Sequence, residues 1–182
     1  LEEELGGAAD RASGAPKIAL VLRLSALLAA RARFDRAALR YRELLTLDPA
    51  IDDELLETIE GVARSSDDAA LLRTLFERRI ERAPDPEQAA SWLSQLGELL
   101  AGRFAAPDAA ADALLRAADA AGQAGDAARA TSVLQRVLAL RPDDRAAAGR
   151  LAALHREAGA WVELWATSAV LLRTAPSAEE AA

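Results

Sequence analysis

Residues 111–144 read ADALLRAADAAGQAGDAARATSVLQRVLALRPDD, and this stretch decides the fold class. Apolar side chains recur every three or four positions in two blocks, the spacing of one face of an α-helix. The first stripe is Leu114, Ala117, Ala118 and Ala121, and the second is Ala130, Leu134 and Val137. Gly125 permits a tight reversal between the blocks, and Pro142 ends the second because the residue before a proline avoids the helical region. The stretch therefore predicts two antiparallel helices.

Helix-ending Pro residues and turn-forming Gly residues recur along the chain at a spacing near 34 residues. Prolines close long apolar segments at four positions: Pro49, Pro84, Pro142 and Pro176. The first two are 35 positions apart and the last two are 34 apart, as are Gly125 and Gly159. A period of this length is typical of helix–turn–helix repeats.

On these residues the segment resembles a tetratricopeptide repeat, with Gly125 at the turn between the helices, Ala130 at the small contact position and Pro142 at the end. The resemblance extends over most of residues 18–175. It implies an all-α fold, a right-handed α-solenoid of antiparallel helix pairs with a concave face that binds peptides. Each helix alone would be marginal in water, so stability has to come from stacking neighbouring helices into one core.

The spacing of the prolines departs from the repeat length at one place. Pro84 and Pro142 are 58 positions apart, which is 34 plus 24, so we place an irregularity within residues 85–110. We expect about nine helices in an array over residues 17–176. Residues 1–16 are expected to form a linker or the end of a preceding helix, stopped at Gly6 and Gly7. Residues 177–182 are expected to begin a further helix or to form a tail.

The composition favours helices and contains few of the residue types that commonly carry out catalysis or bind metals. Apolar residues make up 52% of the 182 positions, mostly Ala and Leu, whereas aromatic residues make up 4%. The absence of Cys excludes disulfides and thiolate zinc sites, and one His cannot build a His-rich metal site. We interpret that residue, His155, as a packed core side chain. We therefore expect no catalytic residue, no metal, no cofactor and no enzyme activity.

Charge and hydropathy exclude two classes of partner. The net charge of −7 predicts no attraction to nucleic acid. No uninterrupted apolar run approaches the ~18 residues of a membrane-spanning helix, so we expect no direct membrane insertion. Lys17 is the only Lys among 22 basic residues, which together with the abundance of Ala is typical of a GC-rich, bacterial-type genome. The compartment is left open, with the cytoplasm favoured.

Pairs of neighbouring carboxylates allow two interpretations, acid–base or cation chemistry on one side and helix capping on the other. The pairs are Asp52 with Asp53, Asp67 with Asp68, and Asp143 with Asp144. Each pair falls at a predicted helix start, where an acid accepts from free backbone N–H groups and complements the helix dipole. We favour capping.

The tryptophans also allow two interpretations. Trp161 and Trp165 are four residues apart and share one face of a predicted helix. Packing in the core is favoured for both. The alternative is that their helix caps the array and exposes them as a docking surface, since Trp is enriched at binding hot spots. The same alternatives apply to Trp92, again with packing favoured.

The resemblance also implies which residues line the concave face. The polar candidates from the first helices for binding a partner are Asp53, Glu60, Arg64, Asp119, Gln123, Arg156 and Glu157. Family members that clamp a peptide carboxylate use Lys, Arg and Asn at two positions of this face. Here those positions carry Leu22, Leu56, Leu115 and Gly149, and Ala26, Glu60, Asp119 and Ala153. This departure argues against a carboxylate clamp, and a mixed, mildly acidic face suits a basic or apolar helical partner.

We therefore predict a non-catalytic protein–protein interaction scaffold that recruits or positions a protein or peptide partner, through the concave face or an exposed end. The alternative is a structural spacer or self-association segment of a longer multidomain protein. Self-association would then run through a terminal helix. The sequence leaves the identity of the partner open.

Overall fold

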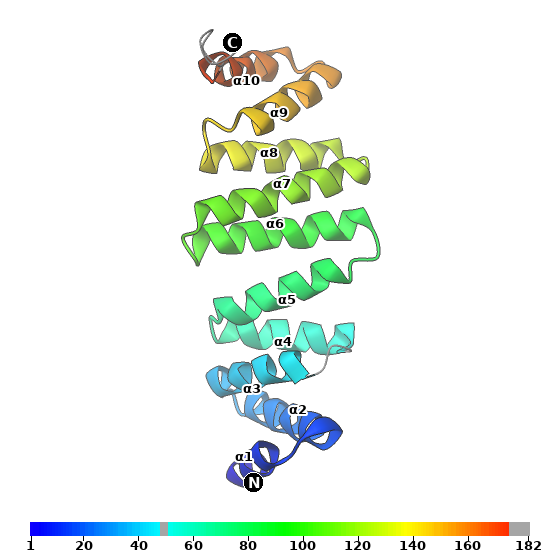
Figure 1. Ribbon diagram of the computed structural model, residues 1–182, viewed down its shortest axis with the longest axis vertical. Coiled ribbons are helices and arrows are strands. Elements are labelled where there is room, and N and C mark those ends of the chain that lie inside the picture. The colour runs from blue at the N-terminus through cyan, green and yellow to red at the C-terminus, as the bar shows by residue number, and fades with distance from the viewer. Residues whose placement is uncertain (48–50, 175–182) are drawn as a thin grey trace, which may run out of the picture. The chain divides into compact units, whose positions relative to one another are not determined.

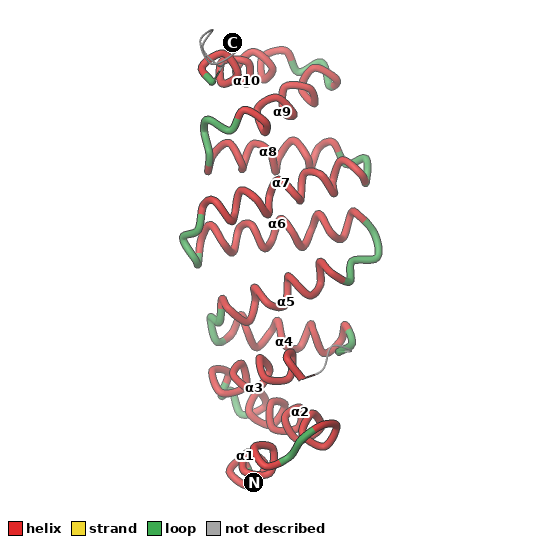
Figure 2. The backbone as a smooth tube through the Cα atoms, in the orientation of Figure 1, coloured by secondary structure: helices red, strands yellow, loops and turns green. Residues whose placement is uncertain are grey.

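The computed structural model describes residues 1–47 and 51–174 (Figure 1). These residues form ten α-helices and no strand (Figure 2). The helices are α1 (Glu2–Arg11), α2 (Gly14–Ala30), α3 (Phe34–Leu47), α4 (Asp53–Ser65), α5 (Ala69–Glu81), α6 (Pro86–Gly102), α7 (Pro107–Gln123), α8 (Ala127–Leu140), α9 (Arg145–Glu157) and α10 (Trp161–Arg173). The predicted all-α fold is confirmed. Pro49, Pro176 and the further helix expected at 177–182 lie outside the described residues.

Helix α1 precedes the predicted array. The described part of residues 17–176 holds nine helices, α2–α10, as expected, and α1 makes ten in the described residues. The helix runs through Gly6 and Gly7, which were expected to stop it. Each glycine costs roughly 0.5–1 kcal/mol in a helix interior. Packing against α2 offsets this cost, since Leu5 and Ala9 of α1 are buried.

The chain divides into two compact parts, Leu1–Leu75 and Phe76–Ala182, and the boundary falls inside α5. In the first part α1 packs on α2, α2 on α3 and α3 on α4. Short connections between successive helices make them neighbours that run in opposite directions (Figure 2). The largest fully buried side chains of this part are Val21, Tyr41, Leu44, Leu45, Leu56, Ile59, Leu71 and Leu75.

In the second part α7 is the central helix. It packs against both α6 and α8, and α9 packs on α8 and on α10 (Figure 1). Helix α7, which begins at Pro107, therefore has a packed neighbour on each side. Both predicted stripes are buried: Leu114, Ala117, Ala118 and Ala121 of α7, and Ala130, Leu134 and Val137 of α8.

One type of turn recurs four times between the helices. In each turn a backbone N–H reaches back five residues, from Arg33 to Leu28, Asp68 to Ala63, Asp126 to Ala121 and Ala160 to His155, over 2.8–2.9 Å. This is the bond of a Schellman motif, which requires a left-handed residue just before the donor. The left-handed residues are Ala32, Asp67, Gly125 and Gly159, with φ of 54°, 54°, 74° and 67°. The reversal predicted at Gly125 and Gly159 is confirmed.

The turn between α6 and α7 differs from these four. Its backbone bond runs from Ala106 back six residues to Leu100, and Ala105 is the left-handed residue with φ of 48°. This turn lies in the stretch where the spacing of the prolines is irregular. The α6–α7 hairpin therefore differs from the four hairpins that close with a Schellman turn.

Acidic residues cap several helices, as the sequence predicts. The Oδ1 atoms of Asp52, Asp68 and Asp144 accept from the N–H groups of Leu55, Leu71 and Ala147 at 2.8, 3.0 and 2.9 Å. Asp85 and Asp126 cap α6 and α8 in the same way. Each of the three acidic pairs thus contributes one helix cap.

Helices α6 and α7 approach so closely that only glycine fits at their contact. A Cβ atom on Gly97 would lie 2.6 Å from Cγ of Leu114 and 3.3 Å from the carbonyl oxygen of Ala110. The first distance is far inside van der Waals contact, and well-packed interiors absorb extra volume poorly.

We therefore expect Gly97→Ala to lower the free energy of unfolding by about 1–3 kcal/mol, as overpacking does. Gly149→Ala is the matched control, because a Cβ at this helical position meets nothing within 4 Å. The control is expected to stabilise by roughly 0.5–1 kcal/mol through the helix preference of Ala. Urea denaturation followed by circular dichroism measures both, and equal effects of the two variants would contradict the close contact.

Candidate functional site

The polar residues predicted for a concave face fall on three helices. In the first part of the chain Asp53, Glu60 and Arg64 lie on α4, and in the second part Asp119 and Gln123 lie on α7 and Arg156 and Glu157 on α9. The guanidinium of Arg64 donates two hydrogen bonds to Glu60 Oε1, at 2.9 and 2.7 Å. Two of the predicted partner-binding residues therefore bind each other.

Asp119 is also engaged within the chain. Its carboxylate accepts from Nη2 of Arg150 at 2.6 Å, which ties α7 to α9. Gln123, Arg156 and Glu157 are exposed at the C-terminal ends of their helices. The charges of Glu60 and Asp119 are thus neutralised by Arg64, which is itself one of the predicted residues, and by Arg150, which the sequence did not single out.

Arginine bridges between alternate helices are the main polar feature that sequence reasoning missed. In the first part α1 and α3 flank a groove of about 740 Å³. Arg31 and Arg33 of the turn before α3 donate to Glu2 of α1 at 2.8 and 3.2 Å, and Arg40 of α3 donates to Asp10 of α1 at 3.1 Å. The apolar lining of the groove includes Leu24 and Leu28 of α2. These bridges fix the distance between α1 and α3, which lie on either side of α2.

The same arrangement is present in the second part. Helices α6 and α8 flank a groove of about 580 Å³ with Leu114 of α7 in its lining. Arg136 of α8 makes a bidentate pair with Glu98 of α6, at 2.8 and 2.9 Å. Arg129 of α8 donates to the carbonyl oxygen of Glu87 in the first turn of α6. Two planar hydrogen bonds hold the two side chains in one geometry, which a Lys cannot do.

Glu43 is the centre of a further charge network in the first part. Its two oxygens accept from Nζ of Lys17 and Nη1 of Arg40, each at 2.9 Å, and three quarters of its side chain is buried. The hydrogen bond from Lys17 lowers the pKa of the Glu43 carboxyl below its ordinary value of 4.5, and the bond from Arg40 adds to the shift. Through Arg40 and Asp10 the network joins α1, α2 and α3.

His155 and Trp92 pack as predicted. His155 is 6% exposed in α9. Trp92 of α6 stacks on Phe76 of α5, with ring centroids 6.0 Å apart, and the guanidinium of Arg79 lies 4.2 Å from the centroid of Trp92. Within the described residues no group of three or more His, Cys, Asp or Glu side chains is arranged to hold a metal ion. None of the described helices is long and apolar enough to cross a membrane.

For Trp161 and Trp165 the favoured interpretation, packing in the core, is wrong. Their exposed fractions are 66% and 81%. Val162 and Leu172 of the same helix are exposed to 81% and 77%. Helix α10 therefore has one face buried against α9, which includes Thr167, and an opposite face of large apolar side chains open to solvent. We call this exposed face, formed by Trp161, Val162, Trp165 and Leu172, the α10 face.

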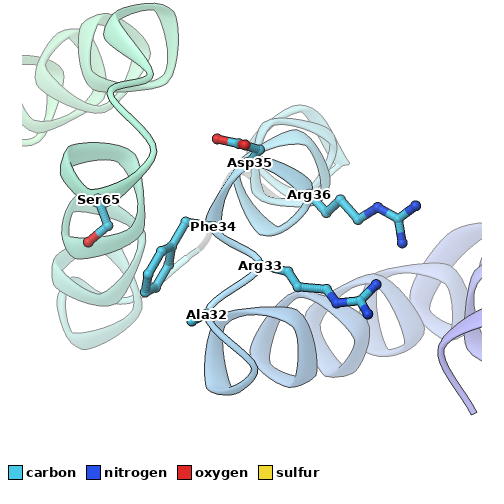
Figure 3. A pocket seen from close by; sticks show the side chains of 6 residues that line it. All are labelled: Ala32, Arg33, Phe34, Asp35, Arg36 and Ser65. Carbon is cyan, nitrogen blue, oxygen red and sulfur yellow. The ribbon is translucent and has the colours of Figure 1, made fainter.

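Phe34 in the first part holds the position that corresponds to Trp161. Phe34 and Trp161 both follow directly on the Schellman turn and begin a helix, α3 and α10 respectively. The ring of Phe34 points toward the end of α4 that carries Ser65, while Arg33 and Arg36 point away (Figure 3). With Ser65 it lines a pocket of about 360 Å³. The helix that follows α3 thus partly covers Phe34, whereas α10 is the last described helix.

Comparison with known proteins adds little. Neither a protein-family model nor a curated protein sequence matches the chain. Two crystal structures of MamA are similar to it, at 20% and 19% sequence identity and TM-scores of 0.32 and 0.33. The first match covers 82% of this chain and 93% of that chain, and the second covers 86% and 91%. At this level of similarity no function is carried over.

The exposure of Trp165 leads to a stability test. We expect Trp165→Ala to change the free energy of unfolding by less than about 0.5 kcal/mol, as surface substitutions do. Trp92→Ala removes packing against Phe76 and Arg79, so we expect a loss of about 1–3 kcal/mol. Chemical denaturation at a protein concentration of about 1 μM compares the two, and a loss at Trp165 as large as that at Trp92 would show that Trp165 is buried.

The Glu43 network predicts a dependence of stability on pH. Because the pKa of Glu43 is lowered in the folded state, its contribution is full above 4.5 and is lost as the pH falls through the folded-state pKa. Glu43→Gln is expected to destabilise by about 1 kcal/mol at pH 7, with the difference from wild type shrinking toward pH 3. Glu57→Gln, an exposed site on α4, serves as the control. A difference that stays constant with pH would contradict the network.

Proposed function

We propose that this chain is a non-catalytic scaffold that binds another protein through the α10 face. The observation that carries the proposal is the concentration of four large apolar side chains, each at least 66% exposed, on one helix. Single exposed apolar residues are ordinary, but a contiguous patch marks an interaction site. Two of the four residues are Trp, which is among the residue types enriched at binding hot spots.

The proposal includes a repeat architecture. We infer a tetratricopeptide-like, right-handed α-solenoid, in which the repeating unit is a helix pair closed by a Schellman turn. Support comes from the recurrence of that turn with Ala32, Asp67, Gly125 and Gly159 in the left-handed position. The bridges between alternate helices add support, because alternate helices become neighbours when helix pairs stack.

The second part of the chain offers a second candidate binding surface within the same proposed function, on the first helices α7 and α9. Gln123, Arg156 and Glu157 are exposed there, and Asp53 is exposed on α4 of the first part. Glu60 and Asp119 are held by Arg64 and Arg150, so reversing the charge of either acid would also break a bridge. Glu157→Lys together with Gln123→Lys probes this surface without breaking a bridge.

Site-specific photo-crosslinking tests the proposed function. We expect p-benzoylphenylalanine at position 162 to give covalent adducts with protein when the full chain is irradiated in the cells that make it. Position 128 is the matched control, because Ala128 is an exposed residue of α8 one repeat of 34 positions earlier. Mass spectrometry identifies what is attached to the chain.

The outcomes separate the proposal from its rival. An adduct with a different protein that is specific to position 162 supports the scaffold, whereas an adduct with a second copy supports the alternative of a self-association segment. Equal adduct formation at positions 162 and 128 contradicts binding through the α10 face and favours a structural spacer. The double substitution of Gln123 and Glu157 is expected to leave the adduct at position 162 intact, since it lies on other helices.

A further inference from the structure

We infer that the surface of α2 and α3 that α1 covers is a docking site for an acidic amphipathic helix of a partner protein, which takes the place of α1 there. The inference goes beyond the proposed function, because this site lies in the first part of the chain and the α10 face lies in the second. Its support comes from the charges that hold α1, from the space that α1 leaves unfilled and from the connection between α1 and α2.

The charges around Glu2 show which chemistry the site accepts at one end. The Glu2 carboxylate lies among three guanidinium groups, with those of Arg31 and Arg33 at 2.8 and 3.2 Å and that of Arg36 at 3.9 Å. Arg33 and Arg36 project from the start of α3 on the same side, away from Phe34 (Figure 3). Several guanidinium groups around one carboxylate favour an anion strongly over a neutral or basic group. The bound helix therefore needs an acid at this end.

The rest of the contact completes the pattern of an acidic amphipathic helix. Leu5 and Ala9, one turn apart on α1, are buried, and α1 packs on α2. At the other end Asp10 accepts from Arg40 of α3 at 3.1 Å. The site thus accepts an acid, a leucine one turn later, a small residue one turn after that and a second acid directly after the small residue.

Helix α1 fills this site incompletely, because two glycines face the groove between α1 and α3. Gly6 and Gly7 line the space of about 740 Å³ together with Leu24 and Leu28 of α2. Leu39 of α3 also lines it and is 61% exposed. A Cβ atom on Gly6 would lie 3.9 Å from the nearest side-chain atom, which is ordinary van der Waals contact. A helix with a large apolar side chain at the Gly6 position therefore buries more apolar surface here than α1 does.

The unfilled space selects a partner protein over a second copy of this chain. Helix α1 of a second copy has the same two glycines, so it would leave Leu39 as exposed as before. A partner helix with the same acids and a leucine at the Gly6 position would cover Leu39. The arginines at both ends of the site are complementary in charge to such a helix and would repel a basic one.

The connection between α1 and α2 permits the exchange. It lacks the five-residue reach-back of the four Schellman turns: Ala12 and Ser13 are extended, with ψ of 161° and 159°, and Gly14 has φ of 63°. Helix α1 has ten residues, fewer than the ~12–15 at which an isolated helix becomes marginally stable in water, and Gly6 and Gly7 weaken it further. The arginines that hold Glu2 are half or more exposed, where ion pairs contribute little. Helix α1 can therefore leave its site while the helices below it stay folded.

Fluorescence anisotropy with synthetic peptides tests the inference on the full 182-residue chain. The probes are a dye-labelled peptide of residues 2–11 and the same peptide with Gly6→Leu. We expect the Gly6→Leu peptide to bind about tenfold more tightly or better, because its leucine enters the groove. Glu2→Gln in that peptide is expected to weaken binding severalfold at low salt, with the difference lost at high salt, because it removes the charge that the arginines hold.

Substitutions in the chain are expected to act in the opposite direction, because α1 competes with the peptide. Gly6→Leu in the chain strengthens the hold of α1 and should weaken peptide binding about tenfold, whereas Leu5→Gln loosens α1 and should strengthen it. Gly61→Leu on α4 is the matched control, because a Cβ at this helical glycine meets nothing within 4 Å. Circular dichroism verifies that each variant is folded.

Three results would overturn the inference. One is peptide binding that Gly6→Leu in the chain leaves unchanged, and another is the absence of binding by either peptide at about 1 mM chain. The third is a dimer in sedimentation that Leu5→Gln abolishes, which would assign the site to α1 of a second copy. None of these results alters the outcome of crosslinking at position 162, so the inference and the proposed function fail separately.

Discussion

The Schellman turn is the constraint on which the rest of this structure depends. Four connections close with the same five-residue reach-back, and each requires one residue with positive φ. Glycine accepts this conformation freely, whereas for other L-residues the left-handed region costs about 1–2 kcal/mol. Ala32 and Asp67 adopt it nonetheless. The turn brings whole helix faces into contact. The burial of their Leu, Ile and Ala side chains outweighs a backbone strain of this size.

Close approach then decides which side chains can hold the helices in place. Alanine and glycine stripes let α6, α7 and α8 pack tightly, as the missing Cβ of Gly97 shows. Close packing leaves alternate helices near enough for one arginine to span the helix between them, as Arg136 and Arg150 do. Exposed pairs of this kind each contribute little to stability. Their effect is on geometry, since a bidentate Arg–Glu pair fixes the spacing of the two helices.

The sequence predicted what depends on local pattern. The buried stripes of α7 and α8, the reversals at Gly125 and Gly159 and the acidic caps all follow from spacing and residue type along one stretch of chain. It gave no signal for the turns at Ala32 and Asp67, because neither residue type demands a positive φ. It placed a helix stop at Gly6–Gly7, where tertiary packing of the preceding Leu and the following Ala overrides the preference of glycine.

The candidate site depends even more on contacts between helices, which a local sequence pattern does not predict. A periodic pattern states which face of a helix is apolar, but it does not state whether another helix covers that face. Trp161 and Trp165 have the spacing of core residues, yet both are exposed in the described structure. Likewise the pairing of Asp119 with Arg150, 31 positions away, depends on how α7 and α9 are stacked.

An apolar face that none of the described helices covers has a thermodynamic consequence. The exposed Trp, Val and Leu side chains of α10 remain in water. Burying them would therefore be favourable, as the burial of apolar faces is in the preceding helix pairs. Covering them requires no new type of contact, only another apolar helix in the position that α4 holds beside Phe34 in the first part (Figure 3). The interaction surface proposed for this protein is therefore an apolar helix face of the kind that packs between neighbouring helices within each part of the chain, and association would use the same type of contact.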